Sequence, residues 1–145
     1  MALPTPDAAL FKVKVDLQVR WGDMDALGHV NNARYLTYFE TARIAYFEML
    51  GPDKRITIEG VTPVLARVTC DYLRPVEYPA SLQVGVRVTR VGTTSLEFEH
   101  LVLDKATGAA CAVGTAVLVA WDFRTRAKAP LPESIRKRIA EIDGV

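Results

Sequence analysis

The chain has 145 residues, of which 50% are hydrophobic and 24% charged, and its 18 basic and 17 acidic side chains give a formal net charge of +1. This length and apolar content fit a single globular domain, residues 1–145, that can bury a core without disulfides or a structural metal. The balanced charge excludes the strongly basic surface of a general nucleic-acid binder or of a protein that binds anionic membranes.

The first predicted element is a strand over residues 12–21 with one face in water. Hydrophobic and polar residues alternate strictly along it, and a period of two is typical of a strand that packs on a core by one face. The hydrophobic positions are Val13, Val15, Leu17, Val19 and Trp21.

A polar loop then leads into a long helix. Asn31 or Asn32 can cap this helix, which runs to about Leu50, and Gly51-Pro52 supplies its C-terminal stop. Apolar residues spread around most of its circumference, so we expect the helix to be enclosed on several sides. Residues 22–32 place two carboxylates, an imidazole and two carboxamides before the free N–H groups of the helix start, an arrangement suited to attack on a polarised carbonyl.

Four further strands are predicted at 63–73, 81–91, 94–103 and 109–123, and the short links between them favour antiparallel neighbours. One face of the last strand carries mostly alanine and glycine, which would let a helix backbone approach the sheet closely. Its residues are Ala112, Gly114, Ala116, Leu118 and Ala120. The tail over 132–142 has isoleucines at helical spacing and predicts a short amphipathic helix.

The order of these elements predicts an α+β fold in which one curved antiparallel sheet of five strands wraps around one long central helix, with a short C-terminal helix. The outer face and the edges of such a sheet stay exposed. We therefore expect a homodimer that extends the sheet edge to edge and forms its sites between subunits, with a homotetramer as the alternative.

The two cysteines, Cys70 and Cys111, fall in apolar runs and are not spaced with histidines or with each other in a metal-ligand pattern. We expect two core thiols in a reducing compartment and no metal site. Residues 1–10 lack the basic and apolar regions of a signal peptide, and no run reaches the roughly 18 apolar residues of a membrane span. These features predict a soluble cytoplasmic protein.

The segment 22–32, which reads Gly-Asp-Met-Asp-Ala-Leu-Gly-His-Val-Asn-Asn, and the helix positions Tyr35, Phe39, Glu40 and Ala42-Arg43 resemble the hotdog-fold thioesterases. The similarity is to the 4-hydroxybenzoyl-CoA thioesterase-like branch, which includes many bacterial acyl-CoA thioesterases, and it spans most of the chain. The resemblance implies a hotdog fold and hydrolysis of an acyl-CoA, or of an acyl carrier protein (ACP) thioester, with a medium, long or aromatic acyl group. It implies no cofactor.

The same resemblance implies roles for three loop residues. Asp25 stands at the second acidic position of the family motif and would be the catalytic carboxylate, while the backbone N–H of Asn32 would bind the thioester carbonyl. His29 matches the histidine spacing of plant acyl-ACP thioesterases, but Leu27 stands where those enzymes have asparagine. Asp25 would act as general base on water or as a nucleophile that forms a mixed anhydride, and the sequence leaves both open.

Three further residues are candidates for binding substrate. Tyr35 and Phe39, at the helix start, would line an acyl pocket, with plain core packing as an equal alternative. Arg90, beside a glycine turn, would contact the phosphates of coenzyme A, with a solvated surface arginine as its alternative. A competing hypothesis for the whole chain is a non-catalytic module that binds acyl-CoA or acyl-ACP. The Asp, Asn-Pro and His pattern of the enoyl-CoA hydratases that share this fold is absent.

Two other acidic residues are expected to serve the structure. Asp23 is predicted to cap the helix or to pair with Arg20 or Arg34. Glu40 is predicted to form an ion pair with Arg43, three positions further along the helix, or with Arg34.

Overall fold

The computed structural model of the protein describes residues 4–145. In chain order its elements are η1 (Ala8–Leu10), β1 (Val13–Gln18), η2 (Trp21–Asp23), α1 (Arg34–Glu48), β2 (Thr62–Tyr72), β3 (Ser81–Val91), β4 (Ser95–Asp104), β5 (Ala110–Asp122), β6 (Ala127–Lys128) and α2 (Glu133–Asp143), where η denotes a 3-10 helix. The four long strands and the C-terminal helix lie within about one residue of their predicted ranges, whereas the short β6 was not predicted.

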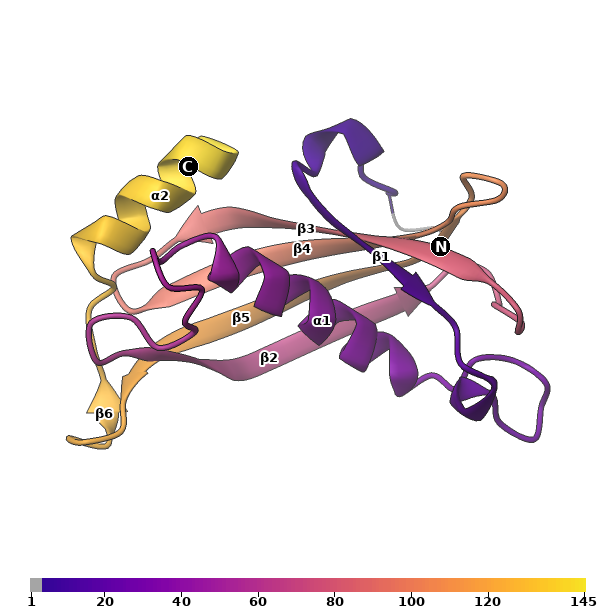
Figure 1. Cartoon of the computed structure of the whole chain (residues 1–145), viewed down its shortest axis with the longest axis horizontal. Helices are drawn as coiled ribbons and strands as arrows, with labels where there is room; N and C mark the ends of the chain where they lie inside the picture. The colour runs from indigo at the N-terminus through magenta and orange to yellow at the C-terminus, as the bar shows by residue number, and fades with distance from the viewer. Residues whose placement is uncertain (1–3) are drawn as a thin grey trace.

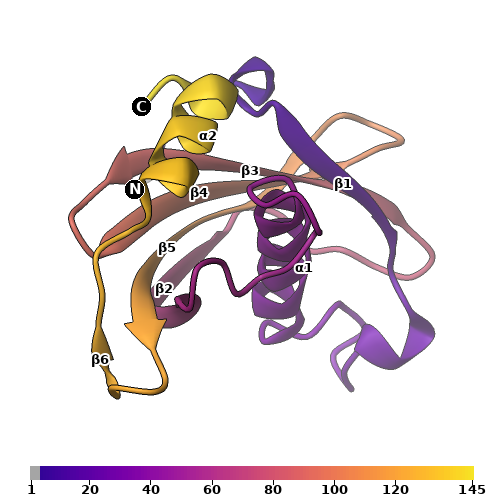
Figure 2. The same ribbon diagram turned by 60° about the vertical axis from the view of Figure 1, so that its left-hand side comes forward.

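The long strands form one antiparallel sheet in the order β1-β3-β4-β5-β2, and β6 pairs with β5. This sheet curls as a half-barrel around α1, which crosses its concave side (Figure 1, Figure 2). The second helix packs beside β3 and reaches the far end of α1, where the Tyr46 hydroxyl donates to Asp143 over 2.6 Å. The predicted hotdog architecture is confirmed.

About half of the α1 surface is buried against the sheet. Its buried residues are Tyr35, Tyr38, Phe39, Ala42, Arg43, Tyr46 and Phe47. The alanine- and glycine-rich face of β5 permits this contact, because a Cβ atom on Gly114 would overlap the Phe39 ring and lie 2.5 Å from the Thr69 carbonyl oxygen. The opposite side of α1 is exposed at Glu40 and Glu48. The prediction of a helix enclosed on several sides is therefore wrong for a single chain.

The first strand ends earlier than predicted, at Gln18, and the chain turns into η2. Trp21 opens this turn with its side chain 77% exposed, so the prediction that it extends the apolar face of the strand is wrong. The cause is local, since the Asp23 carboxylate accepts the Arg20 N–H over 3.0 Å and the Asp23 N–H donates to the Arg20 carbonyl. These bonds bend the chain and end the period of two.

The helix begins at Arg34, and Asn31 caps the turn before it. The Asn31 side-chain oxygen accepts the Ala33 N–H over 2.9 Å, and its carbonyl oxygen accepts the Arg34 N–H over 3.0 Å. Neither predicted residue is the N-cap of α1, which is Ala33 and has no side-chain cap; Asn31 caps only the turn that precedes the helix. In residues 4–145, Asn32 makes no side-chain hydrogen bond.

Both cysteines are free thiols, with Cys111 buried and Cys70 half-buried. Burial raises the pKa of each thiol, so both stay protonated at neutral pH. Across residues 4–145, no helix has the length and hydrophobicity that crossing a bilayer requires. Over the same range, no three side chains of His, Cys, Asp or Glu gather as a metal site would need.

Candidate active site

The loop between η2 and α1 is held in shape by its own backbone. The Asp25 N–H donates to the His29 carbonyl over 3.0 Å, the Gly28 N–H donates to the Asp25 carbonyl over 3.1 Å, and the Asn31 N–H donates to the Asp23 carbonyl over 2.9 Å. Gly28 has a φ of +85°, a left-handed conformation that glycine adopts at little cost. The loop thus presents Asp25 from a closed turn in front of the helix.

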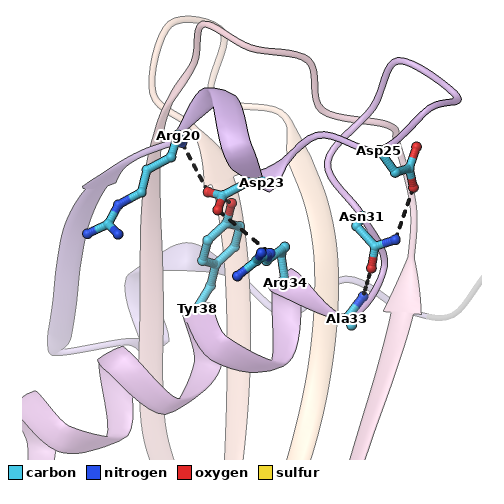
Figure 3. A network of polar contacts seen from close by, with 7 residues as sticks. All are labelled: Arg20, Asp23, Asp25, Asn31, Ala33, Arg34 and Tyr38. Atoms are coloured by element: carbon cyan, nitrogen blue, oxygen red, sulfur yellow. Dashed lines mark hydrogen bonds and ion pairs between the residues drawn. The ribbon is translucent and has the colours of Figure 1, made fainter.

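The Asp25 carboxylate is half-buried and is oriented by two donors. Its Oδ1 accepts the Leu27 N–H over 2.9 Å, and its Oδ2 accepts Asn31 Nδ2 over 3.1 Å (Figure 3). Asn31 also caps the turn before α1 through Ala33, so it couples the carboxylate to the helix start. A carboxylate has about four acceptor positions, and two remain here for a proton of water or for attack on a carbonyl carbon.

The backbone N–H of Asn32 has no acceptor within residues 4–145, whereas the N–H groups of Asn31, Ala33 and Arg34 are all bonded. Asn32 is an exposed residue. Its carbonyl oxygen accepts the Tyr72 hydroxyl over 2.8 Å, which ties this residue to β2. The helix start therefore offers one free, anchored donor of the kind that stabilises an oxyanion.

The loop residues line two neighbouring hollows. Asp25 lines one of them with Trp21, Gly22, Met24, Ala26, Gly28 and Tyr78. The other is lined by His29, Val30, Asn32, Tyr35, Tyr72, Leu73, Arg74 and Pro75. The structure thus brings Asn32, His29 and Tyr35 together at one hollow, whereas Asp25, on the same loop, lines the other. His29 Nε2 lies 3.5 Å from Glu77 Oε1, and no bond joins His29 to the Asp25 side chain within the described range.

Asp23 lies on the other side of the loop from Asp25 (Figure 3). Its buried carboxylate accepts the Tyr38 hydroxyl over 2.7 Å and the Arg20 N–H over 3.0 Å, and it lies 3.8 Å from Arg34 Nε. Burial acts to raise the pKa of Asp23, but these donors and charges outweigh it and hold the pKa below its ordinary value. The predicted pairing with Arg34 is confirmed, and the bond to Tyr38 was not predicted.

Tyr38→Phe should lower the free energy of unfolding by about 1–3 kcal/mol at pH 7, because the buried Asp23 carboxylate loses its closest donor. The folded pKa of Asp23 lies below its unfolded value of about 3.9, so its contribution is present above that pH and is lost as pH falls through the folded pKa. Urea unfolding at pH 7 and pH 3 should show a smaller deficit at pH 3. Tyr78→Phe, on a tyrosine that is 47% exposed, is the control, and an equal loss there would contradict the interpretation.

The aromatic residues of the helix start divide between pocket and core. Tyr35 meets the Tyr72 ring edge-on, with centroids 5.1 Å apart, and burial raises the pKa of Tyr35 to about 12. Phe39 is 0% exposed and stacks on His100 at 4.6 Å between centroids. The structure therefore places Phe39 in the core, away from any surface that a ligand could reach in one chain.

Arg43 turns inward instead of pairing with Glu40. Its Nη1 lies 3.4 Å from His100 Nε2, and no ion pair to Glu40 is present in residues 4–145. The prediction of a pair between Glu40 and Arg43 is wrong because the helix turns Arg43 toward the sheet. Burial, followed by the Arg43 charge, lowers the pKa of His100 to about 3, so this imidazole is neutral.

Arg90 is separated from the loop by nearly the whole length of β3. The β1 end that leads into the loop pairs with Ser81, and Arg90 follows nine residues later on β3, about 30 Å away at 3.3–3.4 Å per residue. Its Nη1 pairs with Glu97 over 3.3 Å. Within one chain, the structure does not bring Arg90 to the other candidate residues.

Comparison with known proteins shows the family and supports the fold. Residues 19–139 match the family model of the thioesterase-like superfamily. The crystal structure of a thioesterase from Thermus thermophilus, complexed with coenzyme A and Zn, is 44% identical, with a TM-score of 0.81 over 93% of this chain and 96% of that chain. The PA2801 protein of Pseudomonas aeruginosa, a putative thioesterase, is 37% identical, with a TM-score of 0.80 over 90% and 99%. The long-chain acyl-CoA thioesterase FadM of Escherichia coli is 22% identical over 130 residues, 90% of this chain and 98% of FadM.

Proposed function

The chain belongs to the thioesterase-like superfamily and is a thioester hydrolase of the hotdog fold, and from this premise we propose that it cleaves acyl-CoA to a free acid and coenzyme A, with Asp25 as the catalytic carboxylate. The single observation that supports the proposal is that one loop carries both an oriented carboxylate, Asp25, and an N–H without an acceptor in residues 4–145, that of Asn32. The coenzyme A bound to the Thermus thermophilus protein supports this carrier, and an acyl-ACP substrate is the alternative.

In this mechanism the Asn32 N–H donates to the thioester carbonyl oxygen and stabilises the negative charge that develops there. Such a donor is typically worth about 3–4 kcal/mol in the transition state, and the adjoining helix start adds a favourable dipole. Asp25 either removes a proton from the attacking water or attacks the carbonyl carbon itself. In both routes the C–S bond breaks and the leaving thiolate takes up a proton. In the second route water then cleaves the mixed anhydride, which releases the free acid and restores the Asp25 carboxylate.

The remaining candidates have supporting roles in the proposal. Tyr35 lines the acyl side of the hollow that contains Asn32, and His29 maintains the loop or assists proton transfer. Arg74 lines the same hollow and is a candidate to bind the phosphates of coenzyme A. Arg90 could reach those phosphates only from a second copy of the chain. We place the protein in the cytoplasm, where its two thiols would stay reduced.

The test is thiol release from a panel of short, medium, long, branched and aromatic acyl-CoA thioesters. A hydrolase releases free coenzyme A from at least one of them in many turnovers. The competing hypothesis, a module that only binds acyl-CoA or acyl-ACP, predicts tight binding without any free thiol. Binding without release on the entire panel would therefore overturn the proposed reaction.

We also propose a homodimer that extends the sheet through β2. This strand has 11 residues and lies at the edge of the sheet, with Val64 and Leu65 exposed, and a long apolar edge of this kind needs a partner. Light scattering should give twice the chain mass of 16.0 kDa. Four times this mass would indicate the homotetramer, and a single-chain mass would contradict the edge pairing.

A further inference from the structure

The start of α1 has few contacts that would hold it in place. Its N-cap residue is Ala33, whose side chain cannot accept a hydrogen bond and which is among the weaker residues at this position. The N–H groups of Ala33 and Arg34 are bonded only to oxygens of Asn31, two and three residues earlier. Helix ends that are held only by local bonds fray. The orientation of Asn32, which lies inside this turn, therefore depends on a contact from another part of the chain.

Tyr72, the last residue of β2, supplies that contact. Its hydroxyl donates to the Asn32 carbonyl over 2.8 Å. The tyrosine is itself held, since its backbone pairs with Ala112 of β5 and its ring meets the Tyr35 ring edge-on at 5.1 Å between centroids. Within residues 4–145, no other hydrogen bond joins residues 31–34 to the sheet. Burial raises the pKa of Tyr72 to about 12, so the hydroxyl keeps its proton and remains a donor at neutral pH.

The bond from Tyr72 restricts the direction of the Asn32 N–H. Each peptide group is planar, so the Asn32 N–H lies in one plane with the Asn31 carbonyl, and the Asn32 carbonyl lies in the next plane. The first plane is held by the Arg34 N–H, which donates to the Asn31 carbonyl over 3.0 Å. The second plane is held by Tyr72. A donor that is aimed before the reaction needs no reorganisation as charge develops on the carbonyl oxygen.

We infer that Tyr72 is a positioning residue for thioester hydrolysis: its hydroxyl holds the Asn32 peptide so that the Asn32 N–H is directed at the thioester carbonyl oxygen. This inference rests on the proposed function. Tyr72 takes no part in making or breaking bonds and acts only through Asn32. Its loss should therefore lower kcat and leave KM nearly unchanged, because the donor matters most once negative charge has developed on the oxygen. The loss should be the same for every thioester that the protein cleaves.

Tyr72→Phe removes the hydroxyl and keeps the ring beside Tyr35. It should lower kcat about tenfold, part of the roughly hundredfold or more that removal of an oxyanion donor costs, with KM within about twofold of wild type. Because Tyr72 is 49% exposed, the melting temperature should stay within about 2 °C of wild type. Steady-state thiol release from each cleaved acyl-CoA and thermal unfolding measure these effects. A wild-type kcat, or a higher KM with unchanged kcat, would overturn the inference.

Tyr46→Phe is the matched control, because it removes a tyrosine hydroxyl from the other end of the same helix. The Tyr46 hydroxyl donates to Asp143 over 2.6 Å, and the residue is 0% exposed. Tyr46→Phe should therefore lower the melting temperature by roughly 3–9 °C and leave kcat unchanged. Tyr72→Phe should thus change the rate, and Tyr46→Phe the stability. Equal falls in kcat would show a general effect of loosening α1 and would overturn the inference.

Backbone nitrogen-15 relaxation reports on the Asn32 amide without any substrate. Its order parameter should fall from about 0.85 in wild type to about 0.6 in Tyr72→Phe, and it should stay at about 0.85 in Tyr46→Phe. An unchanged order parameter together with a lower kcat would mean that the hydroxyl acts on the substrate directly, which would overturn the inference. Lack of thiol release by wild type on the whole panel would overturn the proposed function instead.

Discussion

Asp25→Asn should lower kcat for acyl-CoA hydrolysis by at least about a hundredfold, the usual scale for losing a positioned base or nucleophile. The amide keeps the shape of the carboxylate and can still accept the Leu27 N–H, so the loop and the oligomer should persist. What is lost is the negative charge that removes a proton from water or attacks the carbonyl. Steady-state thiol release, with circular dichroism and light scattering on the same samples, measures both effects.

Two variants serve as controls for this prediction. Asp53→Asn removes an exposed carboxylate from another loop and should leave the rate unchanged. His29→Ala should have a smaller effect than Asp25→Asn, because His29 faces Glu77 and makes no bond to the Asp25 side chain within the described residues. If His29→Ala loses as much activity as Asp25→Asn, His29 is a primary catalytic residue. A near-normal rate in Asp25→Asn would exclude Asp25 from catalysis.

Single-turnover hydrolysis in oxygen-18 water separates the two roles of Asp25. If the carboxylate attacks, water then cleaves the mixed anhydride and can leave its label in the Asp25 side chain, which mass spectrometry of the loop peptide detects. Hydroxylamine should also trap the acyl group on the enzyme. An unlabelled Asp25 together with no trapped acyl-enzyme supports direct attack by water, with Asp25 as general base.

Gly114→Ala should lower the free energy of unfolding by about 2–3 kcal/mol, the upper part of the range for overpacking a core. The added Cβ would overlap the Phe39 ring and lie 2.5 Å from the Thr69 carbonyl oxygen, and a backbone oxygen in a strand cannot move away easily. At about 2–4 °C per kcal/mol for a chain of this size, the melting temperature should fall by roughly 5–10 °C. Thermal and urea unfolding measure this loss.

Gly22→Ala is the matched control, because a Cβ at that position meets no atom within 4 Å. Its melting temperature should stay close to that of wild type. A similar fall in both variants would mean that glycine flexibility, and not the contact between α1 and β5, determines the effect. Unchanged stability in Gly114→Ala would contradict the close packing of Phe39 against the sheet.

Much of the site could be predicted from residues close together in the chain. The loop motif singled out Asp25 as the candidate carboxylate, Asn31 was expected near the helix start, where it caps the preceding turn, and charge predicted the pairing of Asp23 with Arg34. The contacts that local patterns did not identify join segments far apart in the chain. Tyr72 reaches Asn32 across 40 positions in the sequence, and no local pattern marks a strand tyrosine as the anchor of a helix start. The bond from Tyr38 to Asp23 was missed for the same reason.

Local sequence patterns predicted the secondary structure and singled out Asp25 as a candidate, because periodicity, turn residues and short motifs act over only a few neighbouring positions. They predicted the long strands to within about a residue and the alanine- and glycine-rich face of β5 that receives Phe39. Which residues face one another depends on the tertiary structure. In the folded chain Arg43 is buried against His100, and Arg90 lies far from the candidate loop. An apolar space and the hollow that contains Asn32 lie at opposite ends of β2. These outcomes depend on the curvature of the sheet and on how α1 crosses it. Both result from many contacts between segments that are far apart in the chain, which no local pattern describes.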